Sequence, residues 1–157
     1  MNAAHIHLLV NHLPIFSMPV ALVFVLFSLR RNNRPFLNFS LWVLFVCTLT
    51  TVGAYFSGEN AEHMVEKLEF VRKTMIHTHE DAGVISLWLA GVTSALTLVA
   101  IFLRSSVKKI VFVQISIAAS LITVASLAYT GYLGGKIHHP EIDIKPLPQE
   151  AIQGDLK

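Results

Sequence analysis

The chain has 157 residues, of which 54% are hydrophobic and only 14% are charged, and its mean hydropathy is +0.59. Soluble domains carry about 25% charged residues, so this composition excludes a disordered chain and disfavours a soluble globular domain. The formal net charge of +2 is too small to indicate a nucleic-acid-binding protein. A single cysteine, Cys47, excludes an intramolecular disulfide and a cysteine-based zinc or iron–sulfur site.

Four stretches lack Asp, Glu, Lys and Arg and are long enough to cross a bilayer, which takes about 20 apolar residues. In chain order they are residues 3–29, 36–58, 82–103 and 110–135. They use most of the chain and predict one all-α integral membrane domain over residues 1–139, a four-helix bundle with both termini outside. The first stretch does not resemble a signal peptide, because no Lys or Arg precedes it and it is too long.

The charges between these stretches predict the orientation of the bundle. The two short connections carry Arg30, Arg31 and Arg34, and Arg104, Lys108 and Lys109. All ten acidic residues lie instead in residues 59–81 or in the C-terminal tail. The positive-inside rule therefore places both short connections in the cytoplasm. The two termini are then expected on the periplasmic side of a bacterial inner membrane.

Two segments outside the spans have their own patterns. Residues 59–77 are expected to form an outer connecting helix, because apolar residues recur there at helical spacing. Residues 140–157 contain Pro140, Pro146 and Pro148 and are expected to form an extended periplasmic tail.

The eight histidines are concentrated on one side of the membrane. They are His5, His7, His12, His63, His77, His79, His138 and His139. A single interfacial histidine is commonly just a polar surface residue, whereas ionisable groups within spans are rare and usually functional. Because neutral imidazole is the commonest metal ligand, eight on one face predict that at least two bind a metal ion or a haem iron.

His12 and His79 are the first pair of ligands that we expect. His12 lies two residues before Pro14, well within its apolar stretch. His79 opens the third stretch beside Glu80 and Asp81, and a carboxylate there would accept its second N–H and fix its tautomer. The two acids are also explained by a helix N-terminus, which favours negative charge. A second haem would use His5 or His7 with His138 or His139.

Small residues along the last two spans suggest room inside the bundle. They are Ala82, Gly83, Ser86, Ala90, Gly91 and Ser94 in the third, and Ala118, Ala125, Ala128, Gly131 and Gly135 in the fourth. One explanation is a flat macrocycle lying against the backbone. The other is close helix–helix packing through small-xxx-small contacts. The sequence leaves both open.

Residues 7–15, HLLVNHLPI, resemble the opening signature of a bacterial membrane family catalogued as domain of unknown function 2231, which reads approximately His-Pro-x-x-Val-His-Phe-Pro-Ile. Residues 56–59 resemble its small-Gly-acidic motif, His79 its histidine opening the third span, and residues 131–135 its closing Gly-Gly stretch. Leu8 and Asn11 depart from the pattern. The resemblance implies a small four-helix membrane protein that binds b-type haem and associates with respiratory components.

Three functions fit this sequence. The first is a membrane b-type cytochrome with one or two haems, an electron-transfer subunit of a larger complex that exchanges electrons with quinol or a periplasmic carrier. The second is a non-haem site for zinc, copper or iron. Its candidate metal ligands are His12, His63, His77 and His79, and its further candidates are His138, His139, Glu59, Glu62 and Glu80. The third is a structural or assembly subunit without a cofactor.

Overall fold

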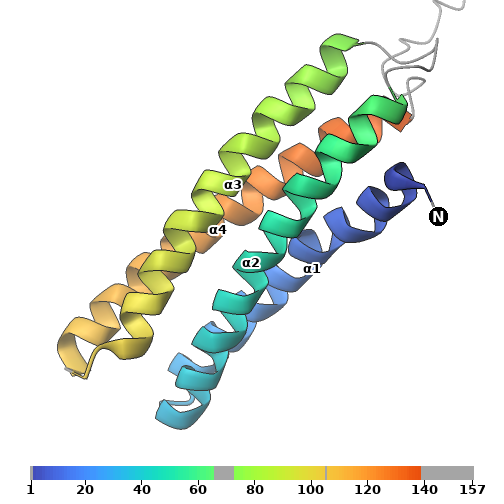
Figure 1. Cartoon of the computed structure of the whole chain (residues 1–157). Helices are drawn as coiled ribbons and strands as arrows, with labels where there is room; N and C mark the ends of the chain where they lie inside the picture. The colour runs from blue at the N-terminus through green and yellow to red at the C-terminus, as the bar shows by residue number, and fades with distance from the viewer. Residues whose placement is uncertain (1, 66–72, 105, 139–157) are drawn as a thin grey trace, which may run out of the picture.

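The computed structural model describes residues 2–65, 73–104 and 106–138, apart from the side chains of residues 60, 63–65, 106 and 138. Four helices account for nearly all of them. They are α1 (Ala3–Arg30), α2 (Arg34–Val65), α3 (Lys73–Phe102) and α4 (Ser106–His138). Successive helices run in opposite directions, so the two short connections lie at the end of the bundle opposite the N-terminus (Figure 1). Within the described residues the chain is therefore all-α, as the sequence predicts.

Asparagines set the limits of the first hairpin. The side chain of Asn2 accepts the backbone N–H of His5 at 3.0 Å and caps α1. In the turn to α2, Asn32 adopts a positive φ of 47°, a conformation that asparagine tolerates better than most residues. The side chain of Asn33 then accepts the N–H of Phe36 at 3.0 Å, so both helices begin with a satisfied donor.

The bundle consists of two hairpins. Helix α1 packs along α2, and α3 packs along α4. Contacts between α2 and α3, and fewer between α1 and α4, join the hairpins. Helices α1 and α3 are diagonal to each other and make no close backbone contact within the described residues. A residue that reaches from α1 to α3 must therefore cross the centre of the bundle.

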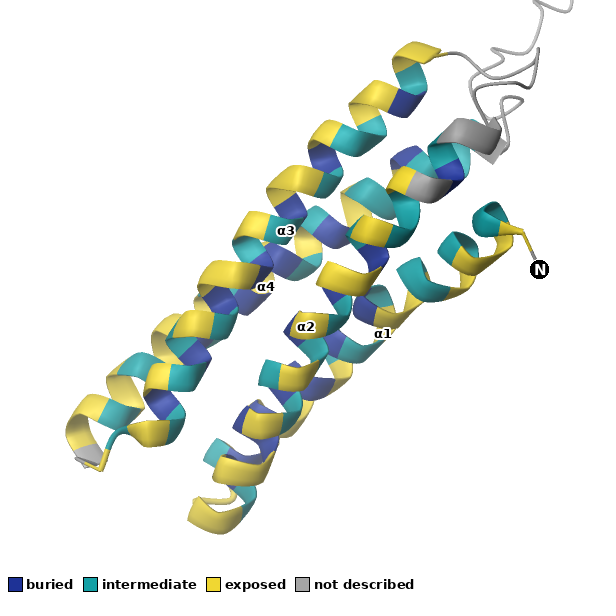
Figure 2. Cartoon of the chain, in the orientation of Figure 1, coloured by how far each residue is buried: buried dark blue, intermediate teal, exposed yellow. Residues whose placement is uncertain are grey.

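The outer surface of this bundle is apolar, unlike that of a soluble bundle. Large apolar side chains point outward, among them Trp88, which is 73% exposed, and Phe102, which is 70% exposed. Figure 2 shows that the buried residues line the sides of the helices that face one another. They combine a cluster of apolar side chains, which includes Met18, Leu41 and Leu44, with many small and hydroxyl-bearing residues. All four helices are long and apolar enough to cross a membrane. Because water would not stabilise such a surface, the chain is a multi-pass membrane protein.

Hydroxyl groups form a polar interface between α3 and α4. The Ser86 hydroxyl lies 2.7 Å from that of Ser126 and 3.0 Å from that of Thr130. One heptad further along α3, the hydroxyls of Thr93 and Thr123 are 2.9 Å apart, and both residues are fully buried. Interhelical hydrogen bonds of this kind, with small side chains that allow close approach, hold helices together in lipid.

The prediction of four helices long and apolar enough to cross a membrane is confirmed, and α2 and α3 extend beyond the predicted spans where the chain runs from one to the other. The expected separate helix over residues 59–77 needs correction at both ends. Residues 59–65 continue α2, and residues 73–77 begin α3. The segment contains no Gly or Pro that would end a helix at the membrane surface. Residues 66–72 and the predicted tail, 140–157, lie outside the described residues.

The Thr93–Thr123 hydrogen bond should couple the stabilities of α3 and α4. We expect T93V and T123V to be non-additive in a double-mutant cycle, with a coupling of about 0.6 kcal/mol. Reversible unfolding in mixed detergent micelles measures it. The control pair is S40A with T123V, because the Ser40 hydroxyl donates to Phe36 within α2. Equal coupling energies in both pairs would contradict a stabilising hydrogen bond between Thr93 and Thr123.

Candidate functional site

Two histidines from the diagonal helices meet in the centre of the bundle. His7 lies in the second turn of α1 and His79 in the second turn of α3, at what we call the histidine-rich end, formed by the beginnings of α1 and α3 and the ends of α2 and α4. Their ring centroids are 6.3 Å apart, and the ring planes cross at 78°. Both side chains are partly buried. Residues 72 positions apart in the sequence thus form one imidazole pair.

The hydroxyl of Ser57 holds the ring of His7 at Nδ1. The Ser57 hydroxyl is within hydrogen-bond distance of the carbonyl of Ala54, at 2.8 Å, and can donate its proton to it. Its oxygen lies 2.9 Å from Nδ1 of His7 and accepts there when the ring carries a proton on Nδ1. In that tautomer the lone pair of a neutral His7 ring is on Nε2.

The second histidine is held in the same way. Nδ1 of His79 lies 3.0 Å from the backbone carbonyl of Thr130, which only accepts. His79 therefore also donates from Nδ1 and keeps its lone pair on Nε2. The Thr130 hydroxyl is part of the network with Ser86 and Ser126, so the carbonyl that orients His79 lies in a well-bonded part of the α3–α4 interface.

Each ring also lies against a glycine. A methyl group added at Gly58 on α2 would come within 3.2 Å of Cε1 of His7. One added at Gly134 on α4 would come within 3.1 Å of Cε1 of His79. These distances are tighter than ordinary van der Waals contact, so a larger residue at either position would displace the ring.

The two hairpins therefore use the same device. In each, Nδ1 of a histidine on the first helix is within hydrogen-bond distance of an oxygen on the second helix, and the ring packs against a glycine there. The two pairs of contacts face each other at the histidine-rich end. Each imidazole is thus held at Nδ1, which is how the second nitrogen of a metal-ligating histidine is usually held.

A buried hydrogen-bond acceptor lies one helical turn after His7. Asn11 follows His7 by one helical turn on the same face of α1, and its Oδ1 is buried without a hydrogen-bond partner in the described part of the chain. Buried polar atoms are nearly always bonded, so this atom is available to accept from a water molecule or a bound group in the interior.

The structure does not bring His12 to His79. His12 is exposed on the outward face of α1, where its ring stacks on Phe16 with centroids 5.9 Å apart. His5 is exposed as well. The side chains of His63 and His138, and the whole of His139, lie outside the described residues. Of the candidates for the haem pair, His7 is the one that lies opposite His79.

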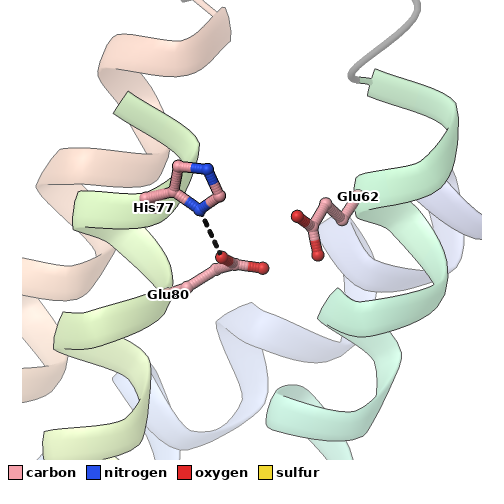
Figure 3. A group of neighbouring side chains, drawn as sticks. All are labelled: Glu62, His77 and Glu80. Carbon is pink, nitrogen blue, oxygen red and sulfur yellow. Dashed lines mark hydrogen bonds and ion pairs between the residues drawn. The ribbon is translucent and has the colours of Figure 1, made fainter. Parts of the chain in front are cut away.

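A second group of metal-ligating side chains lies nearby, where α2 ends and α3 begins. Potential ligand atoms of Glu62, His77 and Glu80 all lie within 4.8 Å of one another. Glu62 points from α2 toward the two residues on α3, and Nδ1 of His77 is 3.3 Å from Oε2 of Glu80 (Figure 3). Of the proposed non-haem ligands, His77, Glu62 and Glu80 are thus brought together. Glu59, His12 and His79 are not part of this group.

Two contacts of His79, with Thr130 and Gly134, were not predicted from the sequence. The face of α1 that carries His7 could have been identified from the sequence. His7, Asn11, Pro14 and Met18 recur at intervals of three or four residues, and the last two are buried. His12 falls outside this face. Asn11 lies one turn after His7 in an otherwise apolar helix, and such a polar residue indicates which side of α1 faces the interior.

Comparison with known proteins places the chain in a family without describing its chemistry. The family model described as "Predicted membrane protein (DUF2231)" matches residues 3–139. No curated protein and no solved structure matches the chain. The matched region contains the histidine pair, both glycines and the Glu62–His77–Glu80 group.

The glycine beside His79 can be tested against its neighbour. A methyl group at Gly135 meets nothing within 4 Å, whereas at Gly134 it meets the imidazole. Alanine adds the same helix propensity at both positions, so G134A should be less stable than G135A by about 1–3 kcal/mol, the usual effect of overpacking. Unfolding in mixed micelles measures the difference. Equal stabilities would mean that the His79 ring does not occupy this position.

Proposed function

We propose that this chain, which belongs to the DUF2231 family of predicted membrane proteins, is a membrane cytochrome in which His7 and His79 would hold the iron of one b-type haem. The observation that carries the proposal is the meeting of these two histidines, from diagonal helices, at a centroid separation of 6.3 Å. Four-helix bundles commonly hold cofactors in this way, with side chains from facing helices.

The separation of the rings suits two imidazoles on opposite sides of one metal ion. A bond from an imidazole nitrogen to a metal ion is about 2.0–2.1 Å long. In a five-membered ring with bonds of about 1.3–1.4 Å, each atom lies about 1.1 Å from the centroid. Two imidazoles on one ion therefore place their centroids at most about 6.4 Å apart. The ring centroids of His7 and His79, 6.3 Å apart, fall within this limit.

The tautomers and the surroundings also fit. Nδ1 of His7 is held by Ser57 and Nδ1 of His79 by the Thr130 carbonyl, so Nε2 is the nitrogen with which each ring would bind a metal ion. Hydrogen bonding at Nδ1 orients a ligating histidine and raises its basicity. The buried Oδ1 of Asn11 would supply a polar contact for a group bound in the interior. Gly58 and Gly134 leave each ring the position that a larger side chain on the neighbouring helix would take.

A haem in this position would supply one-electron redox chemistry. The role of the chain is to hold the two ligands, to fix their protons on Nδ1, and to exclude water with an apolar surface. Because the pair lies at one end of the bundle, the path for an electron to that face of the membrane is short. Quinol in the bilayer and a soluble carrier at that face are the two partners that we propose, with the chain as a subunit of a larger redox complex.

We propose that the histidine-rich end faces the periplasm of a bacterial inner membrane. Arg30, Arg31 and Arg34 in one short connection, with the basic residues of the other, lie at the opposite end of the bundle (Figure 1). Basic residues in short connections are retained in the cytoplasm.

Reporter fusions test this orientation. Alkaline phosphatase, which is active only outside the cytoplasm, should be active when fused after Val65 and inactive when fused after Asn32. Green fluorescent protein fused at the same two positions serves as the control, because it should give the reverse pattern. If the phosphatase is active only when fused after Asn32, the orientation of the bundle is the opposite of the one proposed.

Removing either histidine of the pair should remove the haem. We expect H7A and H79A each to lower the haem content per chain at least about tenfold, because the iron loses an axial ligand. H12A is the matched control on the same helix and should retain the haem. Haem content is measured by pyridine haemochrome assay on protein purified in detergent.

Added imidazole separates loss of a ligand from loss of the fold. In H79A it should enter the space left by the side chain and restore a low-spin spectrum. If H12A loses the haem while H7A retains it, the ligand assignment is wrong. If all three variants retain it, the haem lies elsewhere in the chain.

A further inference from the structure

We propose that Glu62, His77 and Glu80 form a binding site for a divalent first-row transition metal ion, separate from the histidine pair and independent of the haem. The site joins the end of α2 to the beginning of α3, the two segments that flank residues 66–72 (Figure 3). A metal ion bound there would fasten the hairpins to each other at the histidine-rich end.

The ligand atoms need only small movements to hold an ion. Atoms bound to one zinc ion at about 2.0–2.2 Å lie no more than about 4.4 Å apart. The candidate atoms already lie within 4.8 Å of one another. His77 and Glu80 are side chains with 63% and 38% exposure, so both can rotate without moving a helix. The hydrogen bond between them, at 3.3 Å, is long and easily exchanged for bonds to an ion.

The charges at this position favour a cation. Glu62 and Glu80 approach each other from different helices, although two carboxylates repel. Glu59 on α2 and Asp81 on α3 lie within one turn of the group and add further negative charge. A divalent ion bound between Glu62 and Glu80 would offset the repulsion between their carboxylates.

The donor set selects the class of ion. One imidazole nitrogen and two carboxylate oxygens suit zinc, manganese or ferrous iron, whereas calcium and magnesium prefer oxygen ligands alone. Three protein ligands leave at least one position for water, so such an ion would exchange with the solvent outside the membrane. We take zinc as the probe because it has no redox chemistry and is counted separately from haem iron.

Zinc titration of the full chain tests the site. The protein is purified in detergent, stripped with a chelator and titrated with zinc in competition with a chromophoric chelator. We expect one tight site, a higher unfolding temperature with zinc, and affinities lowered at least about tenfold in E62Q, H77N and E80Q. Since the three side chains lie on two helices, their equal effects would identify a shared ion.

Two neighbouring carboxylates provide the controls. E59Q and D81N remove the same charge from the same turns but lie outside the group, and they should bind zinc within about twofold of the wild type. If they weaken binding as much as E62Q and E80Q do, the effect is general surface charge and the proposal is overturned. Wild-type affinity in E62Q, H77N and E80Q, or no tight zinc site in the wild type, overturns it as well.

The circular dichroism spectrum of each stripped variant shows whether it keeps its helical fold. H77N replaces the imidazole with an uncharged side chain, so it separates the loss of a ligand from the loss of a negative charge.

Discussion

The interior of this bundle follows from one constraint: within lipid, a polar group has no water with which to bond. A buried N–H or O–H is therefore stabilised when it finds a partner inside the protein. The hydroxyls of Ser86, Thr93 and Thr123 meet this requirement across the α3–α4 interface. The two imidazoles meet it at Nδ1, through Ser57 and the Thr130 carbonyl. Because these donors are satisfied by fixed partners, the rings are held in one orientation, and the chemistry proposed for them depends on that orientation.

Space in the interior is controlled by the same small residues that allow the helices to approach. Gly58 and Gly134 give each imidazole a position beside the neighbouring helix, and larger residues there would push the rings out of line. The sequence left two explanations of the small residues open, a macrocycle or close packing. In the structure, the hydroxyl contacts between α3 and α4 support close packing along most of the bundle, while the glycines beside the histidines are specific to its histidine-rich end.

The sequence was sufficient for the fold, because four long apolar stretches have few other solutions in a membrane. It was insufficient for the histidine pair. His7 and His12 are both near the start of α1, but five residues turn a helix by about 140°, so the two point to different sides. Which side faces inward depends on how α1 packs against α2, and the buried residues Pro14 and Met18 place His7 there. The continuation of α2 and α3 beyond the spans was also missed, although it is what brings Glu62 close to His77.

The central claim is that His7 and His79 hold an iron between them. The most direct measurement is a reduced-minus-oxidised absorption spectrum of the purified protein, with iron analysis on the same sample. The account predicts a sharp band at about 560 nm and one haem iron per chain, as expected for two imidazole ligands. A sample that shows neither, and that takes up no haem on reconstitution, would contradict it, and the two histidines would then only join the hairpins.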